Sequence, residues 1–133
     1  CGVGSFGIEC LSRGVKKVIF IENYKGVLPL LKKNLISLKS VKNYNIIEKN
    51  IYNDNVFQNL DHKFDIIFMD PPFKDDNLDN IFSEIHNHKI LNKNGIIIIH
   101  RHKDETDIHP LNLKLIEEKL YGISKIKFFS NLD

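Results

Sequence analysis

The chain has 133 residues, of which 42% are hydrophobic and 27% are charged, and this composition excludes a disordered or fibrous protein. At about 100–200 residues per domain, we expect a single domain over residues 1–133. The net charge of +2 falls short of the strongly basic balance of many nucleic-acid binders. The sequence has no apolar run near the roughly 18 residues of a membrane span and no signal-peptide pattern, so we expect a cytoplasmic protein with no membrane partner.

Strand-like and helix-like segments alternate along the first half of the chain. Residues 18–21 are a short β-branched and aromatic run, which is typical of a buried strand. Residues 24 to about 38 carry apolar side chains at helical spacing, and Pro29 falls in the first turns, where proline is tolerated. Residues 44–48 indicate another short strand, and residues 53–60 a short helix.

The second half repeats this alternation. The predicted elements are a strand over residues 64–69, an amphipathic helix over 78–90, a turn at Asn94-Gly95, a strand over 96–99, and an antiparallel strand pair over 113–120 and 123–129. Strands separated by helices predict an α/β fold with a mostly parallel sheet. The continuous apolar runs fit strands that are covered on both faces.

A glycine-rich loop opens the chain as Gly2-x-Gly4-x-x-Gly7. Glycines let the backbone pass close to a ligand, and a helix that begins near Ser5 offers free N–H groups at its N-terminus. Glu22 follows the next strand, close to the spacing of an acidic residue that binds a ribose. This loop alone fits a dinucleotide and S-adenosylmethionine equally well, because both contain an adenosine.

The tetrapeptide Asp70-Pro71-Pro72-Phe73 directly follows the predicted strand 64–69. Two prolines stiffen the turn and constrain the Asp70 carboxylate. A fixed carboxylate and a backbone carbonyl can accept hydrogen bonds from an exocyclic amine, orient its lone pair and stabilise the positive charge that develops on nitrogen. Phe73 can stack on an extruded base. The tetrapeptide therefore favours methylation of an amino group on a nucleobase.

These motifs resemble those of RsmD-type ribosomal RNA (guanine-N2) methyltransferases, which are class I S-adenosylmethionine-dependent enzymes with a Rossmann-like fold. The resemblance is carried by Gly2-Val3-Gly4-Ser5-Phe6-Gly7-Ile8-Glu9, Leu11-Ser12-Arg13-Gly14, Ile21-Glu22, Lys33-Asn34-Leu35, Asn50 and Asp70-Pro71-Pro72-Phe73. It covers nearly the whole chain. It implies methyl transfer to N2 of a guanine in 16S ribosomal RNA, with ribosomal RNA or the small ribosomal subunit as partner. We expect a monomer.

The resemblance also implies a role for each matching residue. The cofactor-binding residues would be Gly2, Gly4, Gly7, Glu22, Asn23, Asn50 and Ile51, and the catalytic residues Asp70, Pro71, Pro72 and Phe73. Among these, Glu22 would bind the ribose and Asn50 the adenine edge. Asp70 would be the catalytic acceptor, Pro71 would lend its carbonyl, and Phe73 would stack on the target base.

The chain departs from the family pattern in two places. The family has a segment and a first strand before the glycine loop, so we expect an N-terminally truncated domain whose first strand is missing from this chain. His100-Arg101-His102 stand after a strand where the resemblance leads us to expect an acidic residue. Together with Lys103 these residues could contact RNA phosphates. The pairs His86-x-His88 and His100-x-His102 lack a third ligand, so we expect no metal.

Three other functions remain open from the sequence. The same proline-rich tetrapeptide permits methylation of adenine N6 in DNA. A dinucleotide-binding oxidoreductase would use the glycine loop but would leave residues 70–73 unexplained. A catalytically inactive remnant would bind neither cofactor, and the binding of S-adenosylmethionine and of NAD would separate these possibilities.

Overall fold

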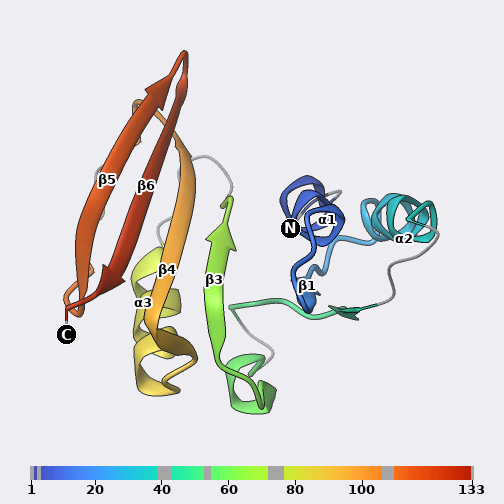
Figure 1. The fold of residues 1–133 in the computed structure, drawn as a ribbon, viewed down its shortest axis with the longest axis horizontal. Coiled ribbons are helices and arrows are strands. Elements are labelled where there is room, and N and C mark those ends of the chain that lie inside the picture. The colour runs from blue at the N-terminus through green and yellow to red at the C-terminus, as the bar shows by residue number, and fades with distance from the viewer. Residues whose placement is uncertain are drawn as a thin grey trace. The chain divides into compact units, whose positions relative to one another are not determined.

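The computed structural model describes residues 2, 4–38, 43–52, 55–71, 77–105 and 110–132. The chain divides into two compact units, unit 1 over Cys1–Val56 and unit 2 over Phe57–Asp133 (Figure 1). In chain order the elements are α1 (Ser5–Ser12), β1 (Val18–Ile21), α2 (Leu28–Ile36), β2 (Tyr44–Ile47), the 3₁₀ turn η1 (Phe57–Asn59), β3 (Phe64–Met69), α3 (Leu78–Asn87), β4 (Leu91–His102), β5 (Leu113–Tyr121) and β6 (Ser124–Asn131). The predicted alternation of strands and helices is confirmed. Among the described residues, no helix has the length and apolar character needed to cross a membrane.

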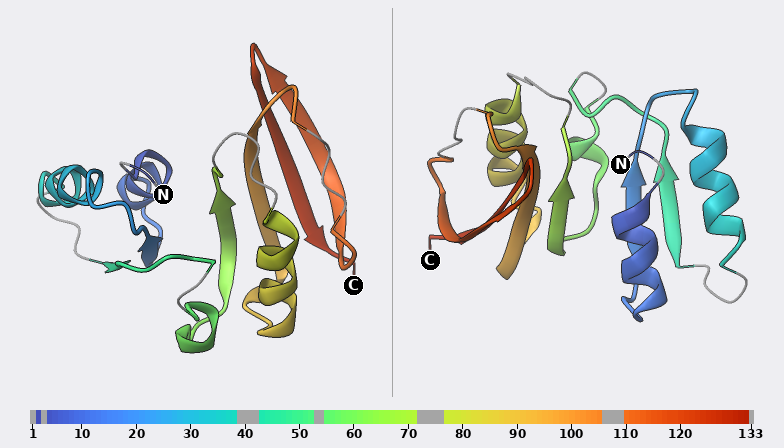
Figure 2. Two further views of the ribbon diagram at one scale, coloured as in Figure 1. Left: turned by 180° about the vertical axis from the view of Figure 1, so that it is seen from behind. Right: turned by 90° about the horizontal axis from the view of Figure 1, so that it is seen from above.

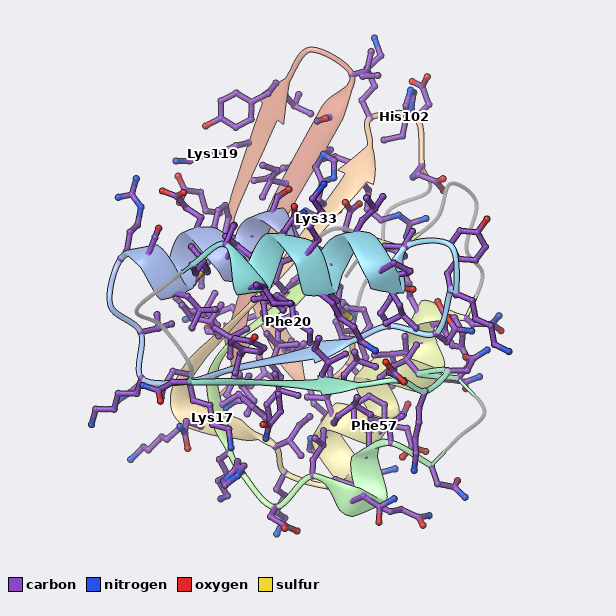
Figure 3. All side chains as sticks on the ribbon, turned by 90° about the vertical axis from the view of Figure 1, so that its right-hand side faces the viewer. Lys17, Phe20, Lys33, Phe57, His102 and Lys119 are labelled. Carbon is purple, nitrogen blue, oxygen red and sulfur yellow. The ribbon has the colours of Figure 1, made fainter. Side chains whose placement is uncertain are left out.

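Unit 1 packs two helices on a parallel pair of strands. β1 pairs with β2 so that Val18 lies opposite Tyr44 and Ile21 opposite Ile47. Figure 3 shows α1 and α2 on one side of these strands, with Phe20 between the helices and the sheet. The buried core consists of Leu11, Phe20, Leu28, Leu31 and Leu35. Burial of each such side chain contributes about 1.5–3 kcal/mol, which is what holds these short elements together.

The helix predicted over residues 24–38 is shorter in the structure and begins at Leu28. Tyr24 instead starts a turn, in which its carbonyl accepts the N–H groups of Val27 at 3.0 Å and Leu28 at 3.2 Å. A helix from Tyr24 would need an N–H from Pro29, which proline lacks, whereas at the start of a helix that N–H is not required. The helix predicted over residues 53–60 is reduced to η1, and residues 53–54 lie outside the described part of the chain.

Unit 2 is a four-stranded sheet with the order β3-β4-β6-β5. β3 and β4 are parallel, whereas β6 is antiparallel to both β4 and β5. The predicted C-terminal antiparallel pair is therefore confirmed. Figure 2 shows α3 on one face of this sheet. Along β4 burial alternates, so that Ile97, Ile99 and Arg101 are buried, whereas His100 lies on the opposite, half-buried face.

The apolar core of unit 2 lies between α3 and the sheet. Ile97 and Ile99 are completely buried, and the ring of Phe82 on α3 meets Phe129 on β6 edge to face, with centroids 6.1 Å apart. The expectation that residues 66–69 are covered on both faces is wrong for β3. Ile66 is 47% exposed, because β3 is an edge strand of this sheet and α3 covers only one face.

The turn predicted at Asn94-Gly95 is also wrong, because both residues lie within β4. Phe64 pairs with Leu91, but Ile66 pairs with Ile96, so the register between β3 and β4 shifts at this point. β4 therefore carries extra residues here, which is a bulge rather than a reversal of the chain. Glycine is common at such irregularities in strands, and this explains why the sequence signal resembled a turn.

Candidate functional site

Gly4 sets the start of α1 in unit 1. It is the residue before the helix and has φ 83°, a left-handed conformation that favours glycine. The first helical hydrogen bond runs from the Ile8 N–H to the Gly4 carbonyl at 2.8 Å. A Cβ atom at Gly4 would stand 2.5 Å from Leu31 Cδ1, so the loop lies directly on the core. The N–H groups of the first turn of α1 point out of its N-terminal end, where they can bind a polar ligand.

Gly7 has a packing role within the same loop and helix. A Cβ atom at this position would lie 2.4 Å from Cε1 and 2.7 Å from Cζ of Phe20. Glycine therefore allows α1 to approach β1 closely enough to bury that ring. An added Cβ at Gly2, by contrast, would meet no heavy atom within 4 Å. Of the three predicted loop glycines, Gly2 thus has open space beside it, which a ligand could fill.

Glu22 closes the loop from the end of β1. Its Oε1 accepts the Gly2 N–H at 2.7 Å, and its Oε2 accepts the N–H groups of Asn23 at 3.1 Å and Tyr24 at 3.0 Å. Partial burial raises the pKa of Glu22, whereas hydrogen bonds from backbone N–H groups, together with the hydrogen bond and charge of the N-terminal amino group, lower it, so that the net pKa lies below the ordinary value of 4.5. Glu22 is therefore held as an ionised carboxylate beside the glycine loop, as a residue that binds ribose hydroxyls would be.

Asn50 organises the loop that follows β2. Its Oδ1 accepts the Tyr52 N–H at 2.9 Å, which is the hydrogen bond of an Asx turn. Asn50 and Ile51 are both half-buried, so the loop presents one amide group and one apolar side chain. The backbone N–H of Asn23 donates a hydrogen bond to Glu22 Oε2, which fixes Asn23 beside the glycine loop. All the predicted cofactor-binding residues thus belong to unit 1.

Asp70 belongs to unit 2 and directly follows the last residue of β3. Its Oδ1 lies 3.0 Å from His100 Nδ1, and its side chain is 54% exposed. Pro71 is half-buried. Pro72 and Phe73 lie outside the described residues, so their predicted roles remain expectations. The structure therefore gives Asp70 both access to solvent and a fixed partner.

Sequence reasoning missed His100 as the partner of Asp70 and Ser124 as the second partner of His100. His100 Nε2 lies 2.9 Å from Ser124 Oγ at the start of β6. One signal was available, because Asp70 and His100 are each the first polar residue after an apolar strand run. β3 and β4 are parallel neighbours with Met69 opposite Ile99, so the next residue of each chain segment stands beside the other.

Arg101 does not serve as a phosphate contact in this structure. Its side chain is 7% exposed and its Nη2 donates to Glu105 Oε2 at 2.7 Å, so the expectation of an RNA contact is wrong for this residue. His102 is the last residue of β4, and its Nδ1 accepts a hydrogen bond from the Asp104 N–H at 3.1 Å. Arg101 is held inward because the alternation of β4 places it on the same face as Ile97 and Ile99.

Unit 2 also has a cavity of about 690 Å³ at the other end of its sheet. Lys63, Leu91 and Lys93 line it where β3 and β4 begin, whereas Asp70 follows the end of β3. It is therefore separate from the Asp70 site. In the described part of the chain, no group of three or more His, Cys, Asp or Glu side chains could hold a metal ion.

Comparison with known proteins gives the family. A family model described as "Conserved hypothetical protein 95" matches residues 1–130. Ribosomal RNA small subunit methyltransferase D of Haemophilus influenzae is 37% identical over 132 residues, which are 98% of this chain and 68% of that protein. The protein of the same name from Buchnera aphidicola subsp. Acyrthosiphon pisum is 31% identical over 128 residues, 90% of this chain and 61% of that protein.

Solved structures agree with this relationship. A conserved protein of Streptococcus pyogenes with 22% identity has the same fold, with a TM-score of 0.88 over 98% of this chain and 81% of its own. A provisionally named methylase of Haemophilus influenzae is 35% identical, with a TM-score of 0.83 over 99% of this chain and 83% of its own. The chain therefore belongs to the RsmD-type methyltransferase family, and its α/β fold is the Rossmann-like fold of class I methyltransferases.

Proposed function

We propose that this protein transfers a methyl group from S-adenosylmethionine to N2 of a guanine in small-subunit ribosomal RNA, with the whole chain acting as one catalytic domain. The observation that carries the proposal is the Asp70 carboxylate at the end of β3, which is exposed yet held by a hydrogen-bond partner. Membership of the methyltransferase family supports the reaction class. The names of the relatives supply the ribosomal RNA substrate.

The residues of unit 1 fit the cofactor that this family implies. S-adenosylmethionine, when bound, supplies a methyl group on a positively charged sulfur. The open space at Gly2 and the N-terminal end of α1 would face its polar groups. Glu22 holds an ionised carboxylate beside the glycine loop through hydrogen bonds from Gly2, Asn23 and Tyr24, and in the proposed complex this carboxylate would bind the ribose hydroxyls. Asn50 and Ile51 would contact the adenine.

Unit 2 would supply the groups that act on the amine. The exocyclic nitrogen of guanine is a poor nucleophile, because its lone pair is delocalised into the base. Asp70 and the Pro71 carbonyl would accept its two N–H groups, which turns the lone pair toward the methyl donor. As the nitrogen bonds to the new carbon it becomes positively charged, and the Asp70 carboxylate stabilises that charge and accepts the departing proton.

The test is methyl transfer with labelled S-adenosylmethionine to undermethylated small ribosomal subunits, to free small-subunit ribosomal RNA and to adenine-containing DNA, followed by nucleoside analysis. N2-methylguanosine in ribosomal RNA is the expected product. N6-methyladenine in DNA would replace this proposal with the DNA alternative. Calorimetry completes the test, because binding of NAD without S-adenosylmethionine would indicate an oxidoreductase, and binding of neither would indicate an inactive remnant.

A further inference from the structure

Three side chains of unit 2 form a continuous hydrogen-bonded chain. His100 Nδ1 lies 3.0 Å from Asp70 Oδ1, and His100 Nε2 lies 2.9 Å from Ser124 Oγ. The three residues come from the end of β3, from β4 and from the start of β6. Both ring nitrogens of His100 are therefore engaged, and only one of the two groups that they contact is a candidate catalytic residue.

Strand register explains why these residues meet. β3 and β4 are parallel, and Met69 lies opposite Ile99. Asp70 follows Met69 and His100 follows Ile99, so these two residues also stand beside one another. β6 is antiparallel to β4 with His102 opposite Ser124, which brings that serine within one pleat of His100. Residues 100 and 102 share a face because side chains alternate along a strand. The register of β3, β4 and β6 therefore brings Asp70, His100 and Ser124 together.

The chemistry of the partners decides where the imidazole proton lies. A carboxylate only accepts hydrogen bonds, so His100 Nδ1 carries a hydrogen and donates it to Asp70 Oδ1. In the neutral imidazole Nε2 is then the acceptor, and the Ser124 hydroxyl donates to it. Asp70 therefore selects the tautomer, and the Ser124 hydroxyl, which can donate as well as accept, holds the other side of the ring.

We propose that His100 is a positioning residue that orients the Asp70 carboxylate for amine methylation, with Ser124 fixing the imidazole; this inference rests on the proposed function. With Oδ1 occupied by His100, the carboxylate cannot rotate freely and Oδ2 is left to accept the substrate N–H. The side chains of His100 and Asp70 are 36% and 54% exposed, and pairs with such exposure add little to folding stability. We therefore assign this contact a role in orienting the Asp70 carboxylate rather than in stabilising the fold.

Two amide variants test this role against a purely structural one. In His100→Asn the side-chain amide nitrogen stands close to the position of Nδ1, so the donor to Asp70 is kept and the link to Ser124 is lost. In His100→Gln the longer side chain carries its amide nitrogen toward the position of Nε2, so the donor to Asp70 is lost. We expect kcat to fall about 10- to 100-fold in His100→Gln and His100→Ala, and to stay within a few-fold of wild type in His100→Asn.

The Michaelis constants separate orientation from binding. We expect KM for S-adenosylmethionine and for RNA to change less than about threefold in all three variants, because the affected interaction is made at the reacting amine. The matched control is His62→Ala, which removes an exposed histidine of unit 2 and should leave kcat and KM unchanged. Equal kcat values for wild type and His100→Gln, or equal losses in the Asn and Gln variants, would overturn the proposal.

Nitrogen-15 NMR of the imidazole gives a readout that needs no activity. We expect the Nδ1–H tautomer for His100 in the wild type and in Ser124→Ala, and a mixture of tautomers in Asp70→Ala, which removes the acceptor. An Nε2–H tautomer in the wild type would overturn the proposal directly. If the tautomer is as expected but the wild type methylates no nucleic acid, the proposed function fails and the positioning role fails with it. If the wild type methylates RNA and His100→Gln does so equally well, only the positioning role fails.

The order Ser124–His100–Asp70 also occurs in serine hydrolases, where the serine oxygen attacks an acyl group. A fluorophosphonate probe distinguishes the two uses, because it labels an activated serine. We expect Ser124 to remain unlabelled. Stoichiometric labelling of Ser124 would overturn the positioning role and assign the three residues to acyl transfer.

Discussion

Gly2 and Glu22 are twenty residues apart in the chain, and the Gly2 N–H donates to Glu22 Oε1 at 2.7 Å. This hydrogen bond ties the glycine loop to the end of β1. The acidic residue therefore has two tasks, because it shapes the loop and, in the proposed function, binds the ribose of the cofactor. The same carboxylate also accepts the N–H groups of Asn23 and Tyr24, so its loss would disturb the backbone on both sides.

Replacement of this carboxylate is expected to weaken cofactor binding. Glu22→Gln puts an amide N–H₂ where a carboxylate oxygen now accepts backbone N–H groups. Hydrogen bonds to charged groups contribute about 1.5–3 kcal/mol, so the dissociation constant for S-adenosylmethionine should rise about 10- to 100-fold. Isothermal titration calorimetry measures it. Glu48→Gln, at a surface residue that pairs with Lys32, is the control, and an unchanged constant in Glu22→Gln would exclude the ribose role.

The lowered pKa of Glu22 predicts a pH dependence of unit stability. Because the pKa in the folded state is below the ordinary value of 4.5, the ionised side chain stabilises the fold fully above pH 4.5, and this contribution is lost as the pH falls through the folded-state pKa. In urea unfolding, the free energies of unfolding of wild type and Glu22→Gln should therefore differ most at neutral pH, and the two values should approach one another progressively below pH 4.5. A difference that grows on acidification would contradict the assigned hydrogen bonds.

Removal of the proposed amine acceptor is expected to stop catalysis without preventing cofactor binding. Asp70→Asn should lower the methylation rate about 10²- to 10⁴-fold, as for loss of a positioned acid–base group. Labelled methyl transfer to undermethylated small subunits measures the rate, and calorimetry should give an unchanged constant for S-adenosylmethionine. Asp61→Asn, at an exposed residue of the same unit, serves as the matched control. Near-normal methylation by Asp70→Asn would remove Asp70 from the mechanism.

Gly7→Ala offers a test in which helix propensity and packing predict opposite changes in folding stability. Gly7→Ala would by propensity stabilise a helix by about 0.5–1 kcal/mol. The new Cβ would stand 2.4 Å from the Phe20 ring, however, and such overpacking costs about 1–3 kcal/mol. We expect net destabilisation in chemical unfolding. Glu9→Ala on the exposed side of α1 should change stability little, and a Gly7→Ala protein more stable than wild type would contradict the close approach of α1 to β1.

The buried pair Arg101–Glu105 predicts a large stability effect. Both side chains are less than 10% exposed, at 7% and 8%, so Glu105→Ala would leave a buried guanidinium without its partner carboxylate. Loss of one member of such a pair costs about 3–5 kcal/mol. Arg13→Ala removes a comparable contact to Glu9 that is exposed to water, and should cost about 0–1 kcal/mol. Equal effects of the two variants in urea unfolding would contradict the burial of Arg101.

Local patterns in the sequence were sufficient for most of the fold. Among the described residues, apolar runs predicted all six strands and helical spacing located α2 and α3 to within a few residues, whereas the glycine loop indicated that α1 begins near Ser5. The glycine loop, Glu22 and Asp70 could be recognised because their chemistry is encoded in neighbouring residues. The sequence reasoning failed in two places. The predicted helix 24–38 begins only at Leu28, because Pro29 is tolerated at the start of a helix but not further in. The predicted turn at Asn94-Gly95 is a bulge within β4.

Tertiary structure alone decided which residues share a partner. The pairing of His100 with Asp70 depends on the register between β3 and β4, and the engagement of Ser124 depends on a third strand that joins the sheet near the C-terminus. The same holds for Arg101, whose face of β4 turns it inward to Glu105. The sequence by itself therefore determined the elements, the family and the candidate chemistry. Register and burial are properties of strands that meet from distant parts of the chain, so only the folded structure could decide the hydrogen-bond partners.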